Sequence, residues 1–232
     1  MLQLAKIVAA SAAGFSAVFL LSGVAIARDS ALQSACFPPE ALKSVPGEKR
    51  TVGANRAFDK SEPERRLQEF APISQERRGS IRRVEIAGGR KAIALTFDMC
   101  EVRGQVSGYD GDIFDYLRSE GVKATIFTSG KWMRSHLSRT QQLMTDPLFE
   151  IASHGYAHRN VRKLAGAQLT EEILGPQHAY EGIRDGLSET QCAKRVENPM
   201  RPVEPRISLY RFPFGACNEA ALKAVTDAGL TA

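Results

Sequence analysis

The stretch DIFDYLRSEGVKATIFT, residues 112–128, joins a helical pattern to a strand-like one. Over residues 112–119 the apolar side chains recur on one helical face, and Gly121 is a typical helix stop. Residues 122–128 include β-branched and aromatic side chains, which favour a strand. Together with the apolar run at 91–97 that comes before it, the stretch predicts one β-α-β unit.

The same alternation of helical and strand patterns continues toward the C-terminus. It predicts a helix over 138–145 capped by Ser138, a strand over 148–152 and a helix from Thr170 that Gly175-Pro176 kinks or interrupts. A strand over 207–212 and a helix capped by Asn218 are expected to follow. Residues 83–87 and 91–97 flank Gly88-Gly89 and predict a hairpin that leads into the core. This order indicates an α/β fold with a parallel sheet, whose strands end at one common edge. Residues 188–206 form a long polar excursion.

The N-terminal part of the chain has a different composition. Lys6 comes before an uncharged run at 7–27 that closes on Ala25-Ile26-Ala27, which predicts an exported chain with a cleaved signal peptide at 1–27. An uncleaved membrane anchor is the alternative. Residues 28–79 contain scattered prolines and charges with little apolar periodicity, which predicts a linker with at most short helices. The folded domain is then expected over 80–232.

The net charge of +5 lies almost entirely outside the motif-bearing segment, residues 91–232. Residues 28–90 hold 13 Lys and Arg against 9 Asp and Glu, whereas residues 91–232 hold 17 of each. A nucleic-acid-binding domain would carry its basic charge on the folded part, so the composition argues against that class of partner. A basic N-terminal segment can instead contact a membrane or another anionic envelope surface.

Polar motifs follow three of the predicted strands. Asp98 closes the first, His154 and His158 follow the strand at 148–152, and Arg211 closes the strand at 207–212. Because parallel strands end at one edge, these side chains are expected to lie together. Two histidines four residues apart can bind one divalent metal ion.

The four cysteines are expected to form disulfides in an exported chain. Cys100 lies two residues after Asp98 and Cys217 two residues after Gly215, so both sulfurs are expected near one site. We therefore predict a Cys100–Cys217 disulfide, among three formally possible pairings. A metal site with thiolate ligands is less favoured, because no closely spaced cysteine pair occurs.

The ordered motifs Thr96-Phe97-Asp98, Ser153-His154-Gly155-Tyr156-Ala157-His158 and Arg211-Phe212-Pro213-Phe214-Gly215 resemble those of the polysaccharide deacetylases. This family, carbohydrate esterase family four, contains the nodulation protein B homology domain. The resemblance runs from about Arg83 to the C-terminus. It implies a distorted (β/α) barrel and metal-dependent removal of acetyl groups from N- or O-acetylated glycans such as chitooligosaccharide or peptidoglycan.

The resemblance also implies a role for each motif residue. His154 and His158 would bind the divalent metal, which is expected to be zinc, with cobalt, nickel or manganese as alternatives. Asp98 would act as general base, and Arg211 would pair with it and hold it ionised, with an ordinary surface ion pair as the alternative. Phe214 would line the substrate groove and offer its backbone N–H to the oxyanion, with an ordinary core phenylalanine as the alternative. Trp132 is a further candidate for stacking on a sugar ring, with ordinary core packing as the alternative.

Two features depart from the family pattern. Met99 occupies the position of a second Asp that is normally a metal ligand, and a thioether is a poor ligand for such a cation. Glu101 is the predicted replacement, with Asp110 as an alternative and direct ligation by Asp98 as another.

The second departure is that the chain stops at Leu230-Thr231-Ala232, where the family's next strand would begin. This predicts a domain that is incomplete at its C-terminus and lacks the family's late histidine acid. A catalytically impaired glycan-binding envelope protein, and a different metallohydrolase, are therefore kept as alternatives.

Overall fold

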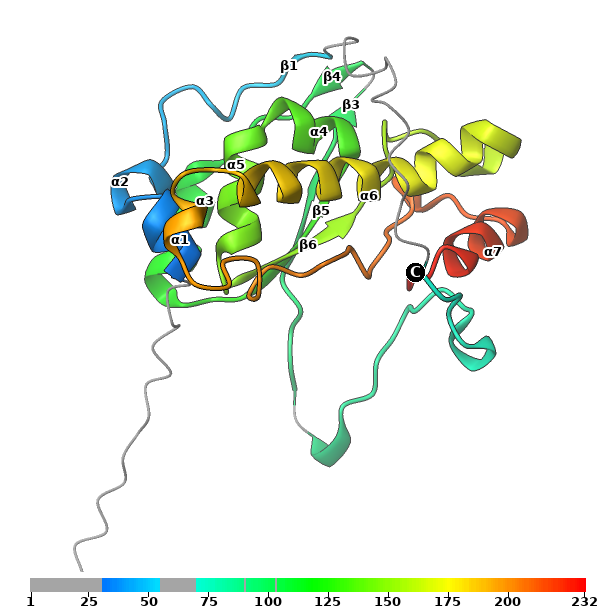
Figure 1. Ribbon diagram of the computed structural model, residues 1–232. Helices are drawn as coiled ribbons and strands as arrows, with labels where there is room; N and C mark the ends of the chain where they lie inside the picture. The colour runs from blue at the N-terminus through cyan, green and yellow to red at the C-terminus, as the bar shows by residue number, and fades with distance from the viewer. Residues whose placement is uncertain (1–30, 55–69, 90, 103) are drawn as a thin grey trace, which may run out of the picture.

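The computed structural model describes residues 31–54, 70–89, 91–102 and 104–232. Its central sheet is parallel, with strand order β2-β5-β6, and the predicted α/β class is confirmed (Figure 1). The strands are β2 (Thr96–Met99), β5 (Ala124–Thr128) and β6 (Phe149–Ser153). Helix α3 (Gly111–Glu120) connects β2 to β5, and α4 (Gly130–Ser135) with α5 (Leu137–Thr145) connects β5 to β6. The predicted β-α-β unit at 112–128 is therefore present, and Gly121 ends α3 in the left-handed conformation.

The sheet continues weakly beyond β6. Tyr210 forms a parallel bridge with Ser153, and Leu209 forms one with Thr231. The strand predicted over 207–212 is thus extended but reduced to isolated bridges, because the chain turns into a short 3₁₀ helix at Pro213–Gly215. The bridge still places this segment beside β6, as the predicted parallel arrangement requires.

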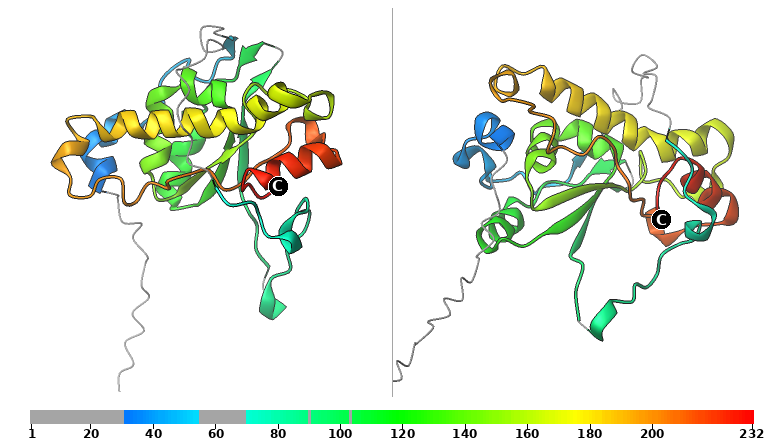
Figure 2. Two further views of the ribbon diagram at one scale, coloured as in Figure 1. Left: turned by 45° about the vertical axis from the view of Figure 1, so that its right-hand side comes forward. Right: turned by 60° about the horizontal axis from the view of Figure 1, so that its bottom comes forward.

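Helices α4, α5 and α6 (Gly166–Ser188) pack against each other on one face of the sheet, and α7 (Glu219–Asp227) packs beside α6 (Figure 2). Of the predicted kink or interruption at Gly175-Pro176, the interruption is wrong, since α6 continues through Pro176. A Cβ at Gly175 would lie 2.7 Å from the Tyr156 ring. Close packing of Tyr156 on this glycine therefore accompanies the unbroken helix, an example of tertiary contacts overriding local propensity.

The segment 31–53, called here the N-terminal anchor, belongs to the folded unit. It contains α1 (Ala31–Cys36), α2 (Pro39–Leu42) and β1 (Val52–Gly53). Strand β1 pairs with β4 (Gln105–Val106), which pairs with β3 (Glu101–Val102). Leu32 is fully buried in the core. The prediction of a linker is therefore corrected for this part, although its helices are short, as expected.

The hairpin predicted over 83–97 is absent from the described residues of this region. A 3₁₀ turn at Ala87–Gly89 replaces it, and only β2 at the end of the region pairs with another strand. Ile93 is 93% exposed and Val84 is 73% exposed. These strand-prone side chains have neither a paired neighbour nor a core to pack against, and the segment extends away from the sheet (Figure 2).

The predicted signal peptide at 1–27 lies outside the described residues. Within the described part of the chain, the helices are too short or too polar for a membrane span.

Candidate active site and metal centre

The three predicted motifs meet at one edge of the sheet. Asp98 lies in β2, His154 follows β6, and Arg211 follows the residue that bridges to β6. The His154 backbone N–H donates to the Thr128 carbonyl, and the Arg211 N–H donates to the Ser153 carbonyl. This edge, called here the rim, is formed by residues 98–101, 154–158 and 211–215. The parallel pairing therefore brings Asp98, His154, His158 and Arg211 together, as the sequence predicts.

His154 is buried and fixed in orientation. Its Nδ1 lies 2.9 Å from the Arg211 carbonyl oxygen, which can only accept, so the proton is on Nδ1. Its Nε2 lies 3.7 Å from Oδ2 of Asp98. Burial is the main cause that lowers the pKa of His154 below its usual value. The ring therefore presents a neutral nitrogen to the rim, and the contact to a carbonyl is the outer-shell bond typical of a metal-binding histidine.

His158 completes the pair of histidines. Its ring centroid lies 4.9 Å from that of His154 and 4.5 Å from that of Phe214. Burial, and next the neighbouring His154, lower the pKa of His158. His158 and Phe214 both have positive φ, at 53° and 60°, which non-glycine residues rarely adopt. Two such residues in contact at the rim indicate a backbone shaped for the site.

Asp98 and Arg211 form the predicted ion pair. Nη1 of Arg211 donates to Oδ1 of Asp98 over 2.6 Å, and Nη2 donates to Oγ1 of Thr96 over 3.1 Å. The guanidinium also lies over the Phe127 ring, 3.8 Å from its centroid. The side chain of the third motif thus contacts two residues of the first, and it leaves Oδ2 of Asp98 directed toward His154.

Glu172 of α6 organises the loop that carries the two histidines. Its carboxylate is fully buried and accepts hydrogen bonds from the backbone N–H groups of Ala157 and Arg159 and from Nε of Arg159. Burial raises the pKa of Glu172, against the lowering effect of the arginine. The sequence did not predict this role, because fourteen positions of chain separate Glu172 from His158 and no local pattern links them.

The residues around the family's missing ligand are arranged differently from the prediction. Met99 packs into the core at 6% exposure. Glu101 is buried, with its carboxylate 3.6 Å from Nζ of Lys131. Among the described residues, the one group of three metal-ligating atoms within 4.8 Å of one another comes from Cys100, His154 and His158. Neither Glu101 nor Asp110 belongs to this group, so the structure does not bring the predicted ligand Glu101 together with the two histidines.

The predicted Cys100–Cys217 disulfide is also wrong. Cys36 bonds to Cys192, while Cys100 and Cys217 are free thiols. The pairing instead joins the N-terminal anchor to the excursion that follows α6. Sequence spacing alone cannot determine which cysteines the fold brings together.

Trp132 cannot stack on a sugar, because its side chain is fully buried. Its indole N–H donates to the Ser107 carbonyl over 3.0 Å, and its ring stacks on His136. The core-packing alternative is correct. Phe214, by contrast, is 68% exposed at the rim, where a sugar ring can reach it.

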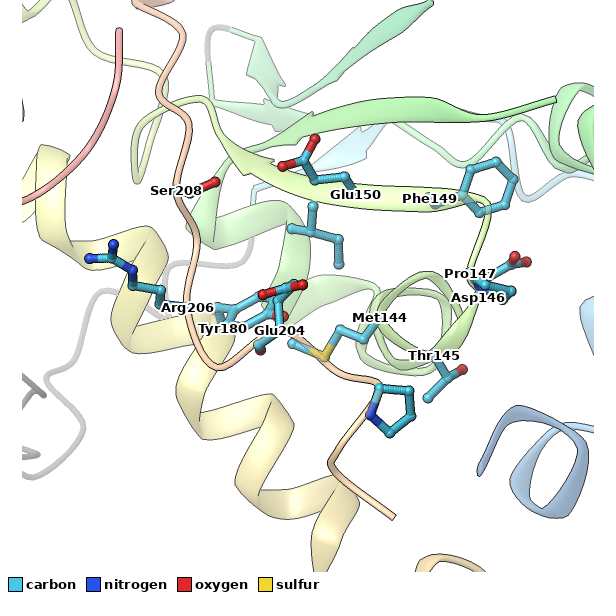
Figure 3. A pocket seen from close by; sticks show the side chains of 12 residues that line it. Met144, Thr145, Asp146, Pro147, Phe149, Glu150, Tyr180, Glu204, Arg206 and Ser208 are labelled. Atoms are coloured by element: carbon cyan, nitrogen blue, oxygen red, sulfur yellow. The ribbon is translucent and has the colours of Figure 1, made fainter. Parts of the chain in front are cut away.

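Two cavities of the described part of the chain differ in their relation to the rim. One, of about 410 Å³, is lined by residues of α5, β6 and α6 and by residues 202–208 (Figure 3). No predicted site residue lines it. The second, of about 380 Å³, is lined by Arg211 and Phe127 together with residues 80–82 and 231–232. Of these two cavities, the second adjoins the predicted chemistry.

A sequence model of the polysaccharide deacetylase family matches residues 85–232, the part of the chain that carries the rim. The chain belongs to this family. A bifunctional xylanase/deacetylase from Pseudobutyrivibrio xylanivorans is 31% identical over 84 residues, which cover 36% of this chain and 13% of that protein. The chain thus spans a small part of this curated relative.

Solved structures of carbohydrate esterase family four are also similar. A Streptomyces lividans esterase in complex with acetate is 28% identical, with a TM-score of 0.42, covering 60% of this chain and 59% of that one. A Bacillus anthracis pseudoenzyme is 17% identical, with a TM-score of 0.41, covering 59% of this chain and 41% of that one. The similar structures therefore include an esterase and a pseudoenzyme.

Proposed function

We propose that this polysaccharide deacetylase is a metal-dependent hydrolase that removes acetyl groups from N- or O-acetylated glycans such as chitooligosaccharide or peptidoglycan. The observation that carries the proposal is the position of Asp98. Its carboxylate lies between the guanidinium of Arg211 and Nε2 of His154, at a rim that also holds His158 and an exposed aromatic ring.

The residues fit a divalent cation. His154 has its Nδ1–H bonded to a carbonyl and its other nitrogen available, and His158 lies beside it. These two side chains would hold the ion, for which zinc is the expected choice and cobalt, nickel or manganese are alternatives. When bound, such a cation supplies Lewis acidity that polarises an acetyl carbonyl.

Asp98 supplies the general base. Its Oδ1 accepts from Arg211 over 2.6 Å, so Oδ2 is the oxygen available to take a proton from the attacking water. Arg211 keeps the carboxylate in place through its second bond, to Thr96. A positioned base of this kind typically contributes about 10² to 10⁴ in rate.

Phe214 forms the substrate-facing surface of the rim. Its ring is exposed and in contact with His158, so a sugar ring that stacks on it would hold its acetyl group near the two histidines. The glycan is thus the proposed partner, and the aromatic ring provides orientation rather than chemistry.

A catalytically impaired glycan-binding protein is the second candidate. The burial of Met99 and the pairing of Glu101 with Lys131 favour it, because no carboxylate takes the place of the family's second aspartate among the described residues. This candidate retains Phe214 and the rim as a binding surface but releases no acetate.

Acetate release separates the two candidates. The full chain, stripped of metal and then supplied with zinc, is incubated with chitooligosaccharide and with peptidoglycan fragments. We expect zinc-dependent acetate release that His154→Ala abolishes and that the control His136→Gln, at a histidine away from the rim, retains. Glycan binding without acetate at any metal supplied would favour the second candidate, and neither binding nor acetate would contradict both.

We also propose that the chain is exported. The predicted signal peptide at 1–27 supports this, as does the Cys36–Cys192 disulfide, since such bonds persist in oxidising compartments. Sequencing the N-terminus of the protein recovered from outside the cytoplasm should give a start at Arg28. A start at Met1 would favour the alternative in which residues 1–27 are not cleaved and anchor the chain in the membrane.

A further inference from the structure

Cys100 has a fixed backbone at the rim. Its N–H donates to Oγ of Ser107 over 3.2 Å, and its carbonyl accepts from the Ser107 N–H over 3.0 Å. The residues on either side are held in strands, Met99 in β2 and Glu101 in β3. A side chain on so constrained a backbone has a defined direction, and that of Cys100 brings Sγ to the two histidines.

The three side chains together form a recognisable set of metal ligands. Sγ of Cys100 and one nitrogen from each of His154 and His158 lie within 4.8 Å of one another. In tetrahedral zinc sites the bonds are about 2.3 Å to sulfur and about 2.0 to 2.1 Å to nitrogen, which places the ligand atoms within about 4 Å of each other. Side-chain shifts of about 1 Å would bring the three atoms to that spacing. Cys100 and His154 are buried, so two of the three ligand atoms lie below the exposed surface of the rim.

The neighbouring side chains leave this role to Cys100. Met99 is turned into the core, Glu101 faces Lys131, and Oδ1 of Asp98 is bonded to Arg211. Of the free cysteines, Cys217 lies outside the group of ligand atoms. Cys100, one position after Met99, therefore places its sulfur beside the two histidines, where a third metal ligand is needed.

We infer that Cys100 is the third protein ligand of the rim metal, in place of the family's second aspartate, and that its thiol releases its proton to solvent when the metal–thiolate bond forms. This inference rests on the proposed function, because it takes the metal site for granted and specifies its ligands. A sulfur ligand makes the site softer, so zinc and cobalt(II) are favoured over manganese and magnesium. Asp98 then keeps its role as base, since the metal does not need its carboxylate.

Cobalt(II) titration of the metal-free full chain tests the inference, because a cobalt–thiolate bond gives a charge-transfer absorption in the near ultraviolet that nitrogen and oxygen ligands do not give. The wild-type chain and the control variant Cys217→Ser should both show this band. Cys100→Ser should lose it and bind zinc more weakly by more than about 100-fold, because loss of an outer-shell partner already costs about 10- to 100-fold. Cys100→Asp should recover part of the affinity without the band.

The possible outcomes separate this inference from the proposed function. Cobalt bound by the wild-type chain without the band, or a band that remains in Cys100→Ser, would overturn the thiolate ligand and leave the metal site standing. Wild-type chain that binds no cobalt would overturn both. Circular dichroism and quantitation of the Cys36–Cys192 bond establish that each variant is folded, and Cys100→Asp provides a second variant if the serine variant is not.

Discussion

The rim and the N-terminal anchor are both rich in charged side chains, but the charges are used differently. Arg139, in α5, donates to both carboxylate oxygens of Glu48, to Gln142 and to the carbonyls of residues 41–43. At the rim, Oδ2 of Asp98 and Nε2 of His154 face each other at 3.7 Å, and Phe214 is exposed. Arg139 uses its hydrogen-bond donors within the fold and so stabilises it. Asp98 and His154 each keep an atom free for further bonds beside an exposed surface, where it can act on a ligand.

The anchor and the rim are also held rigid in different ways. The anchor is fixed by long-range bonds, which include the Cys36–Cys192 disulfide and a Ser44 N–H donated to Asp115. The rim is fixed by short loops after parallel strands and by the buried Glu172 beneath them. Changes at the rim should therefore reduce activity more than stability, and changes in the anchor should do the reverse.

Asp98→Asn gives the largest expected effect on the rim side. Loss of the base should lower kcat/KM for acetate release by about 10² to 10⁴. The free energy of unfolding should change by less than about 1 kcal/mol, because Asp98 and Arg211 are both more than a third exposed and solvent screens their pair. Steady-state kinetics and urea denaturation measure the two quantities. A variant that unfolds readily would show that the rim is part of the stability core.

Arg139→Met gives the largest expected effect on the anchor side, because Arg139 of α5 binds the anchor. The side chain is buried, and its removal leaves the Glu48 carboxylate without its main partner, so the free energy of unfolding should fall by about 3 to 5 kcal/mol. At 25 °C the folded fraction should keep its kcat. Urea denaturation measures the loss, and Lys223→Met, at an exposed ion pair, is the control that should change little. A lower kcat in fully folded Arg139→Met would show that the anchor also supports catalysis at the rim, which contradicts the division of roles between the two regions.

Glu172→Gln should affect both regions moderately. The amide accepts fewer bonds from Ala157 and Arg159, so zinc affinity should fall by about 10- to 100-fold and the free energy of unfolding by about 1 to 3 kcal/mol. Glu171→Gln is a matched control, since the exposed Glu171 pairs with the same arginine. Calorimetric zinc titration measures the affinity. Equal zinc affinities for the two variants would show that Glu172 does not position the two histidines.

His136→Gln should give the smallest effect, visible only as a pH dependence. Burial lowers the pKa of His136 from its usual 6.5, so the unfolded chain takes up a proton near that pH more readily than the folded chain. The contribution of His136 to stability is therefore present above pH 6.5 and is lost as the pH falls below it. Urea denaturation of metal-free protein should show a larger difference between wild type and variant at pH 7.5 than at pH 5. A difference that does not change with pH would contradict the buried neutral histidine.

Much of the rim could be predicted because its residues follow strands whose patterns are local. Asp98, His154, His158 and Arg211 stand at strand ends, and parallel pairing is enough to bring them together. The cap of α7 by Asn218 and the stop of α3 at Gly121 are likewise set within a few residues.

The features that the sequence did not reveal depend on contacts between distant parts of the chain. Cys36 meets Cys192 across 156 positions, and Arg139 binds a segment about 91 to 98 positions away. Cys100 was assigned to a disulfide because spacing predicts proximity but not the direction of a side chain. The strand-prone runs at 83–87 and 91–97 predicted a hairpin because a local pattern reports strand propensity and not the presence of a pairing partner.

Zinc binding by equilibrium dialysis tests the central claim most directly, namely that the rim holds one metal ion between its two histidines. Metal-free full chain should take up one zinc ion per molecule, and the double variant His154→Ala, His158→Ala should take up none while keeping its Cys36–Cys192 disulfide and its circular dichroism spectrum. A folded wild-type chain that binds no zinc, or a double variant that binds as much as the wild type, would contradict the account.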